Sequence, residues 1–379
     1  MPIKKISDQT LIRLVFALQP IAFGSWLPRI PEIQERLALD AKGLALVLLG
    51  LPTGILITLL FGGKLVRHLG AGATIFYGFI VFLGVVSLPV WANSPAMLFG
   101  ALAIVGSALS VIELGLNVMA DQIEKTSVKL IMNSCHGFWS LGIMLGSLIG
   151  SGLAQFGISP EGSVTLVASL VLVPALLISH ALPRFEYSSA AAVKSVERNW
   201  PSLTLLGISF FAFGIALTEG AIADWSAVYL RDVFEAKGAS IGLGYAAFAA
   251  MVASGRFAGD HFKQRFGARR TAEICSAISL LGIAVVCAAP NLILAYLGFA
   301  LVGIGVSVGF PLGVSAAAQL SDRPPASSVA TLTFIALLGF LVGPVLIGFV
   351  AQALGMRMGL LMLGLPLLLS LILARLLSR

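Results

Sequence analysis

The sequence predicts an all-α integral membrane protein of about twelve transmembrane helices, built as two pseudo-symmetric bundles of six. Of its 379 residues, 58% are hydrophobic and only 11% are charged, and the mean hydropathy is +1.00. A soluble protein needs far more polar surface than this. The apolar residues form long runs that suit spanning helices of roughly 20 residues, without the period-two alternation of an outer-membrane barrel. A long-range repeat relates the two halves.

Twelve apolar segments follow one another at this spacing. They cover residues 10–31, 43–66, 71–92, 95–121, 131–157, 163–182, 202–230, 239–262, 270–289, 291–319, 326–353 and 356–377. Residues 183–201 are polar and predict a cytoplasmic linker between an N-terminal bundle, 1–182, and a C-terminal bundle, 202–379. No small-residue cleavage site follows the polar start, so the first span is expected to be retained.

Basic residues gather in alternate loops. Most of the 24 lysine and arginine residues fall in segments on the same side as the N-terminus, and this bias predicts that both termini are cytoplasmic. It also accounts for the net charge of +7 without a nucleic-acid partner.

The three cysteines, Cys135, Cys275 and Cys287, lie in apolar segments. This placement argues against a disulfide framework or a metal cluster. We expect no metal and no cofactor.

The repeat has an offset of 197 residues. It aligns the inner loops, placing Gly62 on Gly259 and Gly70 on Gly267, and it aligns two distant helices, placing Gly142 on Gly339 and Gly146 on Gly343. Both glycine rows are predicted to be small-residue faces that let helices approach closely. Parallel repeats of this kind are one known transporter architecture, with the substrate site between the halves near the bilayer midplane.

The loop after the second span resembles the signature loop of the major facilitator superfamily. It reads Gly63-Lys64-Leu65-Val66-Arg67-His68-Leu69-Gly70, and its counterpart runs from Gly255-Arg256 to Arg269-Arg270. Arg67 and Gln264 fill the position where the family usually has an acid. The resemblance implies a twelve-helix secondary transporter driven by an ion gradient.

Within that superfamily the chain is similar to the bacterial YbjJ-like branch, near the fucose permeases. The similarity is carried by the runs 24–31, 113–117 and 136–140, and by Asp224-Trp225. This resemblance implies proton-coupled sugar uptake with an acid on the fourth helix as proton carrier, a place that Glu113 occupies.

Charged and polar residues inside the spans are the candidates for chemistry, because a charge inside the membrane is expensive. Glu113, Asn117 and Asp121 follow at i, i+4 and i+8 and share one helix face. Desolvation of a carboxylate favours its protonated form, so Glu113 is a proton-carrier candidate, with a structural hydrogen bond to a neighbouring helix as the alternative. Asn117 is predicted to bind substrate, and Asp121 to take part in gating.

The fifth span begins with a second polar face of Asn133, His136, Trp139 and Ser140. His136 is predicted either to relay protons with Glu113 or to anchor the end of its helix. Asn133 and Trp139 are candidates for substrate contact.

The seventh span carries Glu219, the second proton-carrier candidate, and Asp224. Asp224 is predicted to contact substrate or to pair with Arg29, a gating candidate near the end of the first span. Trp26 and Trp225 are predicted to be interface anchors or substrate contacts.

Two further sites complete the candidates. Gln19, beside Pro20 in the first span, is predicted to line a cavity or to hydrogen-bond a neighbouring helix. Arg256 and Asp260, at i and i+4, are predicted to form a structural or gating ion pair.

The sequence lacks the short signatures of common enzymes, such as HExxH, a Walker A loop or a GxSxG elbow. The leading hypothesis is therefore a monomeric secondary transporter of the bacterial inner membrane. It would move a small, sugar-like solute by alternating access with proton coupling. Efflux of amphipathic compounds and a non-transporting receptor are the alternatives. Because Glu113, Asn117 and His136 align with Phe310, Val314 and Thr333 in the repeat, the coupling site is expected in the first half.

Overall fold

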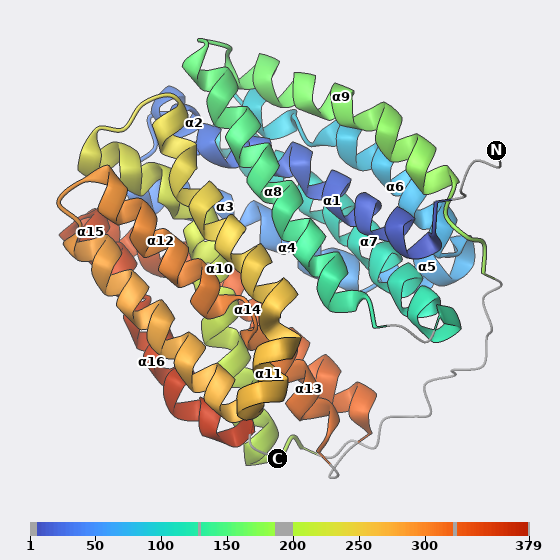
Figure 1. Ribbon diagram of the computed structural model, residues 1–379. Helices are drawn as coiled ribbons and strands as arrows, with labels where there is room; N and C mark the ends of the chain where they lie inside the picture. The colour runs from blue at the N-terminus through green and yellow to red at the C-terminus, as the bar shows by residue number, and fades with distance from the viewer. Residues whose placement is uncertain (1–5, 128–129, 186–199, 321–323, 378–379) are drawn as a thin grey trace. The chain divides into compact units, whose positions relative to one another are not determined.

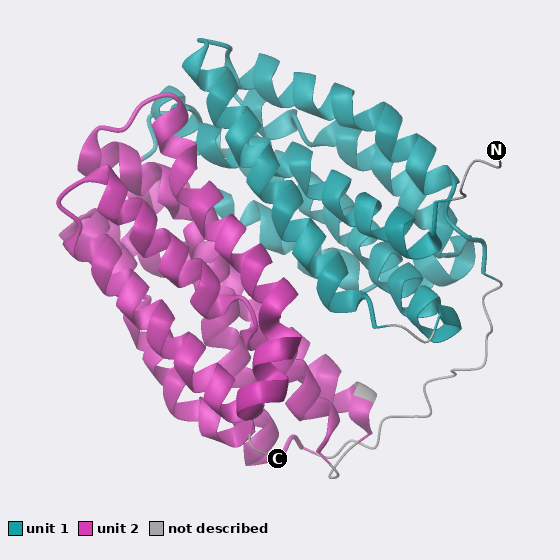
Figure 2. Cartoon of the chain, in the orientation of Figure 1, with its two compact units in different colours: residues 1–39, 46–188 teal, residues 40–45, 189–379 magenta. Residues whose placement is uncertain are grey.

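The computed structural model describes residues 6–127, 130–185, 200–320 and 324–377, and these ranges contain helices and no strand (Figure 1). The predicted linker 183–201 lies largely outside the described residues. The chain divides into two compact units (Figure 2): unit 1 is Met1–Leu39 with Leu46–Ser188, and unit 2 is Asp40–Ala45 with Ser189–Arg379. The division after Ser188 falls inside the predicted linker.

Before the linker, the helices are α1 (Asp8–Trp26), η1 (Leu27–Arg29), α2 (Ile30–Arg36), α3 (Ala41–Leu48), α4 (Gly50–Leu59), α5 (Gly62–Leu69), α6 (Ala71–Val85), η2 (Leu88–Trp91), α7 (Pro95–Ser127), α8 (Met132–Gln155) and α9 (Pro160–His180). After it come α10 (Leu203–Phe234), α11 (Ala239–Ala288), α12 (Leu292–Val306), α13 (Gly309–Ala318), α14 (Pro325–Leu354), α15 (Met356–Leu361), α16 (Gly364–Leu373) and η3 (Ala374–Leu377).

Side-chain oxygens begin several of these helices. The hydroxyl of Ser7 accepts from the backbone N–H of Thr10 at the start of α1, and Ser202 accepts from Leu205 at the start of α10. Such caps satisfy backbone donors that have no partner within the helix.

Eleven described helical segments are long and apolar enough to cross a membrane. One of them, α11, has 50 residues and would be about 75 Å long if straight, far more than the roughly 30 Å of a bilayer core. Its backbone leaves the helical region at Gly267, where φ is 78° and ψ is 162°. The two legs of α11 on either side of Gly267 match the predicted eighth and ninth spans, which brings the count to the expected twelve.

The repeat is visible in the backbone. Gly70, between α5 and α6, has φ 80° and ψ 154°, nearly the values of Gly267 at the same offset of 197 residues. Only glycine adopts this conformation without strain. Both halves therefore make the same turn after their second span.

The two glycine rows lie at tight helix contacts, as predicted. In unit 1, α1 packs on α8, and a Cβ added to Gly142 or Gly146 would overlap the carbonyl oxygen of Ala17 or Ile21. In unit 2, α10 packs on α14, and a Cβ on Gly339 would lie 2.8 Å from the backbone nitrogen of Leu217. The helices can approach this closely because these positions have no side chain.

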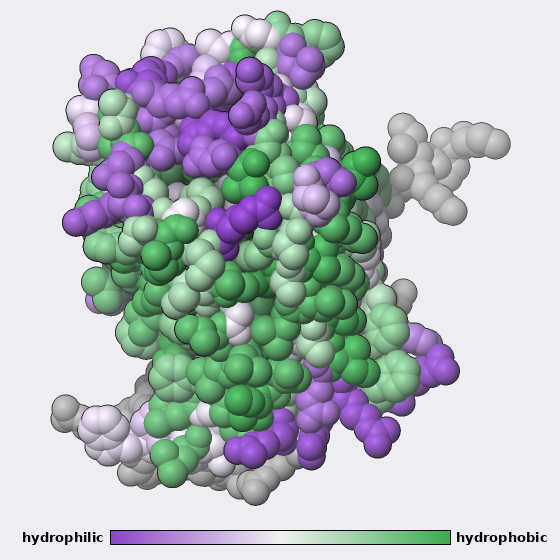
Figure 3. All heavy atoms as spheres, turned by 90° about the vertical axis from the view of Figure 1, so that its left-hand side faces the viewer, coloured by the Kyte–Doolittle hydropathy of each residue, from purple (hydrophilic) through white to green (hydrophobic). Residues whose placement is uncertain are grey.

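On the face shown in Figure 3, hydrophobic side chains form a broad band, and hydrophilic side chains gather beyond both ends of it. Many large apolar residues are exposed, including Leu60 at 82% and Leu170 at 67%. Side chains of this kind are stable against lipid and unfavourable against water.

Candidate functional site

A hydrogen bond joins two candidate residues halfway along the helices of unit 1. The indole Nε1 of Trp139 on α8 donates to Oε1 of Gln19 on α1 over 2.9 Å. Gln19 is fully buried and Trp139 is half-buried. Gln19 therefore hydrogen-bonds a neighbouring helix, one of the two alternatives predicted for it. Both residues of this pair were also predicted to contact substrate.

The orientation of the Gln19 amide follows from its neighbour. An indole N–H can only donate, so the amide oxygen must face Trp139. The amide nitrogen, Nε2, is then left buried with no hydrogen-bond partner in the described part of the chain. A buried donor in this state costs about 1–3 kcal/mol.

Glu113 and Asn117 lie on one face of α7, near the middle of its 33 residues. The side-chain nitrogen of Asn117 donates to the backbone carbonyl of Glu113 over 2.9 Å and lies 3.4 Å from the carboxylate oxygen Oε2. Both side chains are half-buried. Two turns from Glu113, Asp121 instead forms an exposed ion pair with Lys125 over 2.6 Å.

The first turns of α8 hold the remaining candidates of unit 1. The ring of His136 makes an edge contact with Phe16 of α1, with the ring centroids 5.5 Å apart. Asn133 is half-buried in the first turn. The carboxylate of Glu124 accepts from the backbone N–H groups of Ile131 and Met132 over 2.5 and 2.7 Å, which fixes the start of this helix. The relay between His136 and Glu113 stays a prediction.

Unit 2 holds an ion pair inside its spans. Nη2 of Arg256 on α11 lies 2.9 Å from Oε1 of Glu219 on α10, and the side chains are only 12% and 19% exposed. Both residues are near the middle of a spanning leg. Charges at this depth are stable when they are paired. The predicted pairing of Arg256 with Asp260 stays a prediction, and Glu219 was not foreseen as a partner of Arg256.

Tyr245 of α11 extends the polar group in unit 2. It is 5% exposed and lies within electrostatic range of Glu219, Arg256 and Asp224. Asp224 is half-buried on α10, and its carboxylate has no hydrogen bond or ion pair in the described ranges. Tyr245 was not predicted, since it has no charge and lies in no motif that marks a site.

Trp26, at the end of α1, and Trp225, within α10, lie in the protein core. Trp26 is 3% exposed and Trp225 is fully buried, and a Cβ on Gly348 of α14 would lie 3.1 Å from the Trp225 ring. Neither ring faces the surroundings as an interface anchor would. Substrate contact by either stays a prediction.

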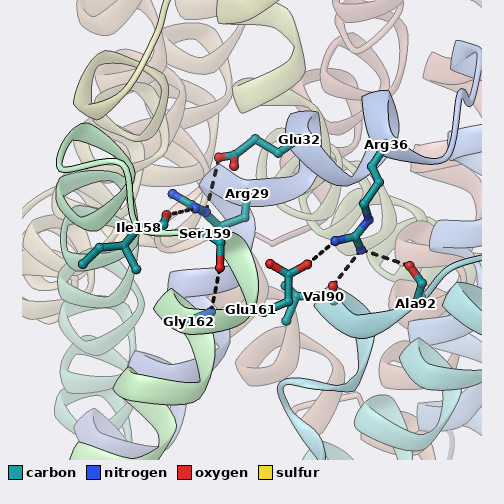
Figure 4. A network of polar contacts seen from close by, with 9 residues as sticks. All are labelled: Arg29, Glu32, Arg36, Val90, Ala92, Ile158, Ser159, Glu161 and Gly162. Carbon is teal, nitrogen blue, oxygen red and sulfur yellow. Dashed lines mark hydrogen bonds and ion pairs between the residues drawn. The ribbon is translucent and has the colours of Figure 1, made fainter.

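Arg29 belongs to a polar network at one end of unit 1 (Figure 4). It is 1% exposed; its Nε lies 3.3 Å from Oε1 of Glu32, and its Nη2 donates to the carbonyl of Ile158 over 2.5 Å. Nη1 is buried without a hydrogen-bond partner in the described ranges. The predicted pairing with Asp224, which would join the two units, stays a prediction.

The same network holds Arg36, which sequence reasoning missed. Arg36 pairs with Glu161 at the start of α9, and its Nη2 donates to the carbonyls of Val90 and Ala92 over 2.6 and 3.0 Å. In unit 2, Arg357 donates to the carbonyls of Cys287 and Ala289. These carbonyls follow Val90 and Ala92 by 197 residues, so an arginine binds the same two positions in both repeats. The 197-residue offset relates the two pairs of carbonyls but not Arg36 and Arg357 themselves, so no repeat signal in the sequence marked these arginines.

The described residues contain no group of three or more histidine, cysteine, aspartate or glutamate side chains able to hold a metal ion. All three cysteines are free thiols.

Spanning helices in two repeated units, with polar groups halfway along them, define a class of polytopic membrane transporters. The profile of the Major Facilitator Superfamily matches residues 14–265, and the chain belongs to this superfamily. It is 30% identical over 348 residues to an uncharacterised MFS-type transporter of Yersinia pestis, covering 92% of this chain and 90% of that protein. It is also 27% identical over 368 residues to the membrane protein MosC of Rhizobium meliloti, covering 95% and 87%.

Solved structures share the fold. A variant of the nucleoside transporter NupG superposes with a TM-score of 0.78 at 13% identity, covering 98% of this chain and 100% of that one. A bacterial homologue of the human lysosomal transporter Spinster, in an inward-facing state, has a TM-score of 0.74 at 17% identity, covering 98% and 96%. The chain is thus a multi-pass membrane transporter and not an enzyme.

Proposed function

We propose that the protein is a secondary active transporter that moves a small, polar, sugar-like solute across the bacterial inner membrane by alternating access coupled to protons. It works as a monomer with both termini in the cytoplasm. The observation that carries the proposal is that each unit holds polar side chains in contact with one another halfway along apolar spanning helices. Such groups are costly at this depth and are therefore retained for function.

The solute class rests on the groups of unit 1. Gln19, Trp139 and Asn117 are uncharged hydrogen-bonding residues, and the Gln19 amide nitrogen has a donor to spare. Hydroxyl and ring oxygens of a sugar-like solute are acceptors for such a donor. The resemblance to the fucose permeases supports the same class.

Proton coupling is assigned to two carboxylates. Glu113 is half-buried in α7, where its negative charge is costly and protonation relieves that cost. Glu219 is held by Arg256, so protonation of Glu219 would release this ion pair and free α10 and α11 to rearrange. His136 is the third proton-binding candidate, positioned near the start of α8.

The test begins with a thermal-shift screen of the purified protein against sugars, organic acids and amphipathic drugs. Tracer flux of the ligand found is then measured in proteoliposomes. Glu113→Gln keeps the shape of the side chain and removes its proton site. We expect this variant to lose uptake driven by a pH gradient, while exchange of solute across the membrane continues. Uptake at the wild-type rate under a pH gradient would contradict the proposal.

Glu235→Gln is the matched control, because Glu235 is an exposed carboxylate at the end of α10 and its loss should leave uptake unchanged. The same assays separate the alternatives. A ligand that binds but shows no flux would indicate a receptor. Extrusion of amphipathic drugs against a gradient, without uptake of sugars, would indicate an exporter.

A further inference from the structure

The first leg of α11 ends in a segment of exposed aromatic rings. We define the α11 elbow as residues 257–270, which include the turn at Gly267. Within it, Phe257, Phe262 and Phe266 are 46%, 45% and 40% exposed. The rings of Phe262 and Phe266 stack with an interplanar angle of 15° and centroids 6.3 Å apart. An exposed pair of stacked phenyl rings is unfavourable in water and favourable against acyl chains.

Basic side chains surround these rings. Arg265 places its guanidinium over the Phe266 ring, 5.4 Å from the centroid, and His261, Arg269 and Arg270 are exposed. Lys263 adds a further charge between them. Only Asp260 at the beginning of the elbow and Glu273 just after it are acidic, and Glu273 is paired with Arg269. The elbow therefore carries a net positive charge next to an apolar surface.

The length of the helix sets the depth of the elbow. From Ala239 to Gly267 the first leg rises about 42 Å, which exceeds the roughly 30 Å hydrocarbon core and matches a bilayer with its headgroups. The last two turns before Gly267 consequently reach the level of the lipid headgroups. At this depth we expect Phe262 and Phe266 at the boundary of the acyl chains and the arginines at the level of the phosphates.

From this arrangement we propose that the α11 elbow is a binding site for an anionic phospholipid. The lipid phosphate is held by Arg265 and Arg270, and its acyl chains cover the stacked phenylalanine rings. Basic side chains beside a membrane surface attract anionic lipids, and an apolar surface next to them adds contact with the chains.

The corresponding turn in the first half of the chain lacks the aromatic and arginine side chains of the elbow. At the corresponding positions it has Leu65 and Leu69 in place of the two phenylalanines, and Gly72 and Ala73 in place of Arg269 and Arg270. The general bias of basic residues toward one side of a membrane protein explains neither the aromatic stack nor its coincidence with the added arginines. The second half has thus gained both parts of a lipid site.

The test measures lipid binding to the full-length protein by native mass spectrometry, with phosphatidylglycerol and phosphatidylcholine supplied at equal concentration. We expect the wild type to retain phosphatidylglycerol preferentially, and Arg265→Gln/Arg270→Gln to lose about fivefold in that preference for each removed charge. Phe262→Ser/Phe266→Ser should weaken retention of both lipids. The preference should also fall as salt is raised. A monodisperse elution profile and unchanged thermal unfolding verify that each variant is folded.

Lys42→Gln/Lys237→Gln is the matched control, because it removes two exposed charges from outside the elbow. The control should keep the wild-type preference. The proposal is overturned if the arginine variant keeps the preference, if the control loses it equally, or if inorganic phosphate displaces the lipid at an ionic strength at which sodium chloride does not, which would identify a site for the free ion. None of these outcomes depends on the transported solute, so failure here and failure of the proposed function are distinguishable.

Discussion

Arg256 and Glu219 illustrate how much a charge inside a spanning helix depends on its neighbour. Their atoms lie 2.9 Å apart, and both side chains are largely removed from solvent. Breaking a fully buried pair costs about 3–5 kcal/mol, because one charge is left uncompensated. Removing both charges costs much less. The pair is therefore a constraint on which substitutions are tolerated, more than a source of stability.

A double-mutant cycle tests this reasoning. Arg256→Gln should lower the free energy of unfolding by about 1–3 kcal/mol, less than for a fully buried pair because some solvent reaches both side chains. Adding Glu219→Gln should recover part of that loss. Thermal or denaturant unfolding in detergent gives the measurement. Lys125→Gln, which breaks the exposed pair with Asp121, should change stability by less than about 1 kcal/mol. If Arg256→Gln and Lys125→Gln lower the free energy of unfolding equally, Arg256 and Glu219 are not the largely buried pair described here.

At the residue scale, the sequence identified which side chains are unusual for a spanning helix but not which residues they contact. Gln19, Trp139, Glu113 and Asn117 were all candidates, and the structure joins them in two pairs. Arg256 was paired with Asp260 on its own helix because i, i+4 spacing is readable from one segment, and that pair stays a prediction. Glu219, which also pairs with Arg256, lies on another helix, and this contact depends on how α10 packs against α11. Tertiary packing is not encoded in local spacing.

Helices α1 and α8 show what the glycines do at the scale of elements. Gly142, Gly146 and Gly150 face the backbone of α1 at successive turns, and an added Cβ would overlap or closely approach carbonyl oxygens there. The contact brings the Gln19 and Trp139 side chains within hydrogen-bonding distance. The spacing between these two helices and the geometry of the polar pair are thus set by the same row of residues.

Gly146→Ala should destabilise unit 1, because the new methyl group meets the Ile21 carbonyl and a neighbouring glycine Cα 3.0 Å away. We expect a loss of about 1–3 kcal/mol, the usual range for overpacking. Gly152→Ala on the same helix meets nothing within 4 Å and should be neutral or stabilising, since alanine favours the helix by up to about 1 kcal/mol. Unfolding temperatures compare the two, and a smaller loss for Gly146→Ala than for Gly152→Ala would disprove the close-contact reading.

The boundaries of the elements were largely predictable, because long apolar runs with polar ends leave few alternatives in a membrane. Some helices run past their predicted ends: helical structure of the first span continues beyond residue 31 through η1 and α2 to Arg36, and α7 continues beyond residue 121 to Ser127. Pro28 and Pro31 do not end this helical run. Each of these prolines lies within the first two residues of its helix, where the backbone N–H that proline lacks would have no partner in the helix. The extension places Arg36 in the polar network beside Arg29, so a small error in the predicted boundary hid this one site residue.

On the scale of the whole molecule, the repeat governs the backbone more strictly than the side chains. The glycine turns at Gly70 and Gly267 are alike, and the glycine rows of α8 and α14 coincide. The polar groups differ: unit 1 has its polar pairs on α1, α7 and α8, whereas unit 2 has an ion pair between α10 and α11. The expectation that the first half holds the coupling site stays a prediction, and unit 2 has a pair of intramembrane charges of its own on different helices.

Arg36 and Arg357, which we call the arginine caps, show a repeated backbone served by side chains that are not repeated. The same pair of backbone carbonyls is bound in each unit, but the arginine comes from a different helix. The carbonyls of residues 90 and 92 in unit 1, and of 287 and 289 in unit 2, need donors where their helices end. Arg36 of α2 supplies them in the first case, and Arg357 of α15 in the second. Arg36 is further bound to Glu161, so it ties α2, η2 and α9 together (Figure 4).

Because each cap acts within its own unit, its loss should loosen that unit alone. We expect Arg36→Gln to speed amide hydrogen exchange around residues 88–92 and at the start of α9, and Arg357→Gln to do so around 286–289 and in α15. Each variant serves as the control for the other, measured by hydrogen–deuterium exchange mass spectrometry. The Arg36 change should have the wider effect, because it also breaks the ion pair with Glu161. If either substitution loosens both halves to the same extent, the units do not open independently, and alternating access by two rigid bundles would lose its structural basis.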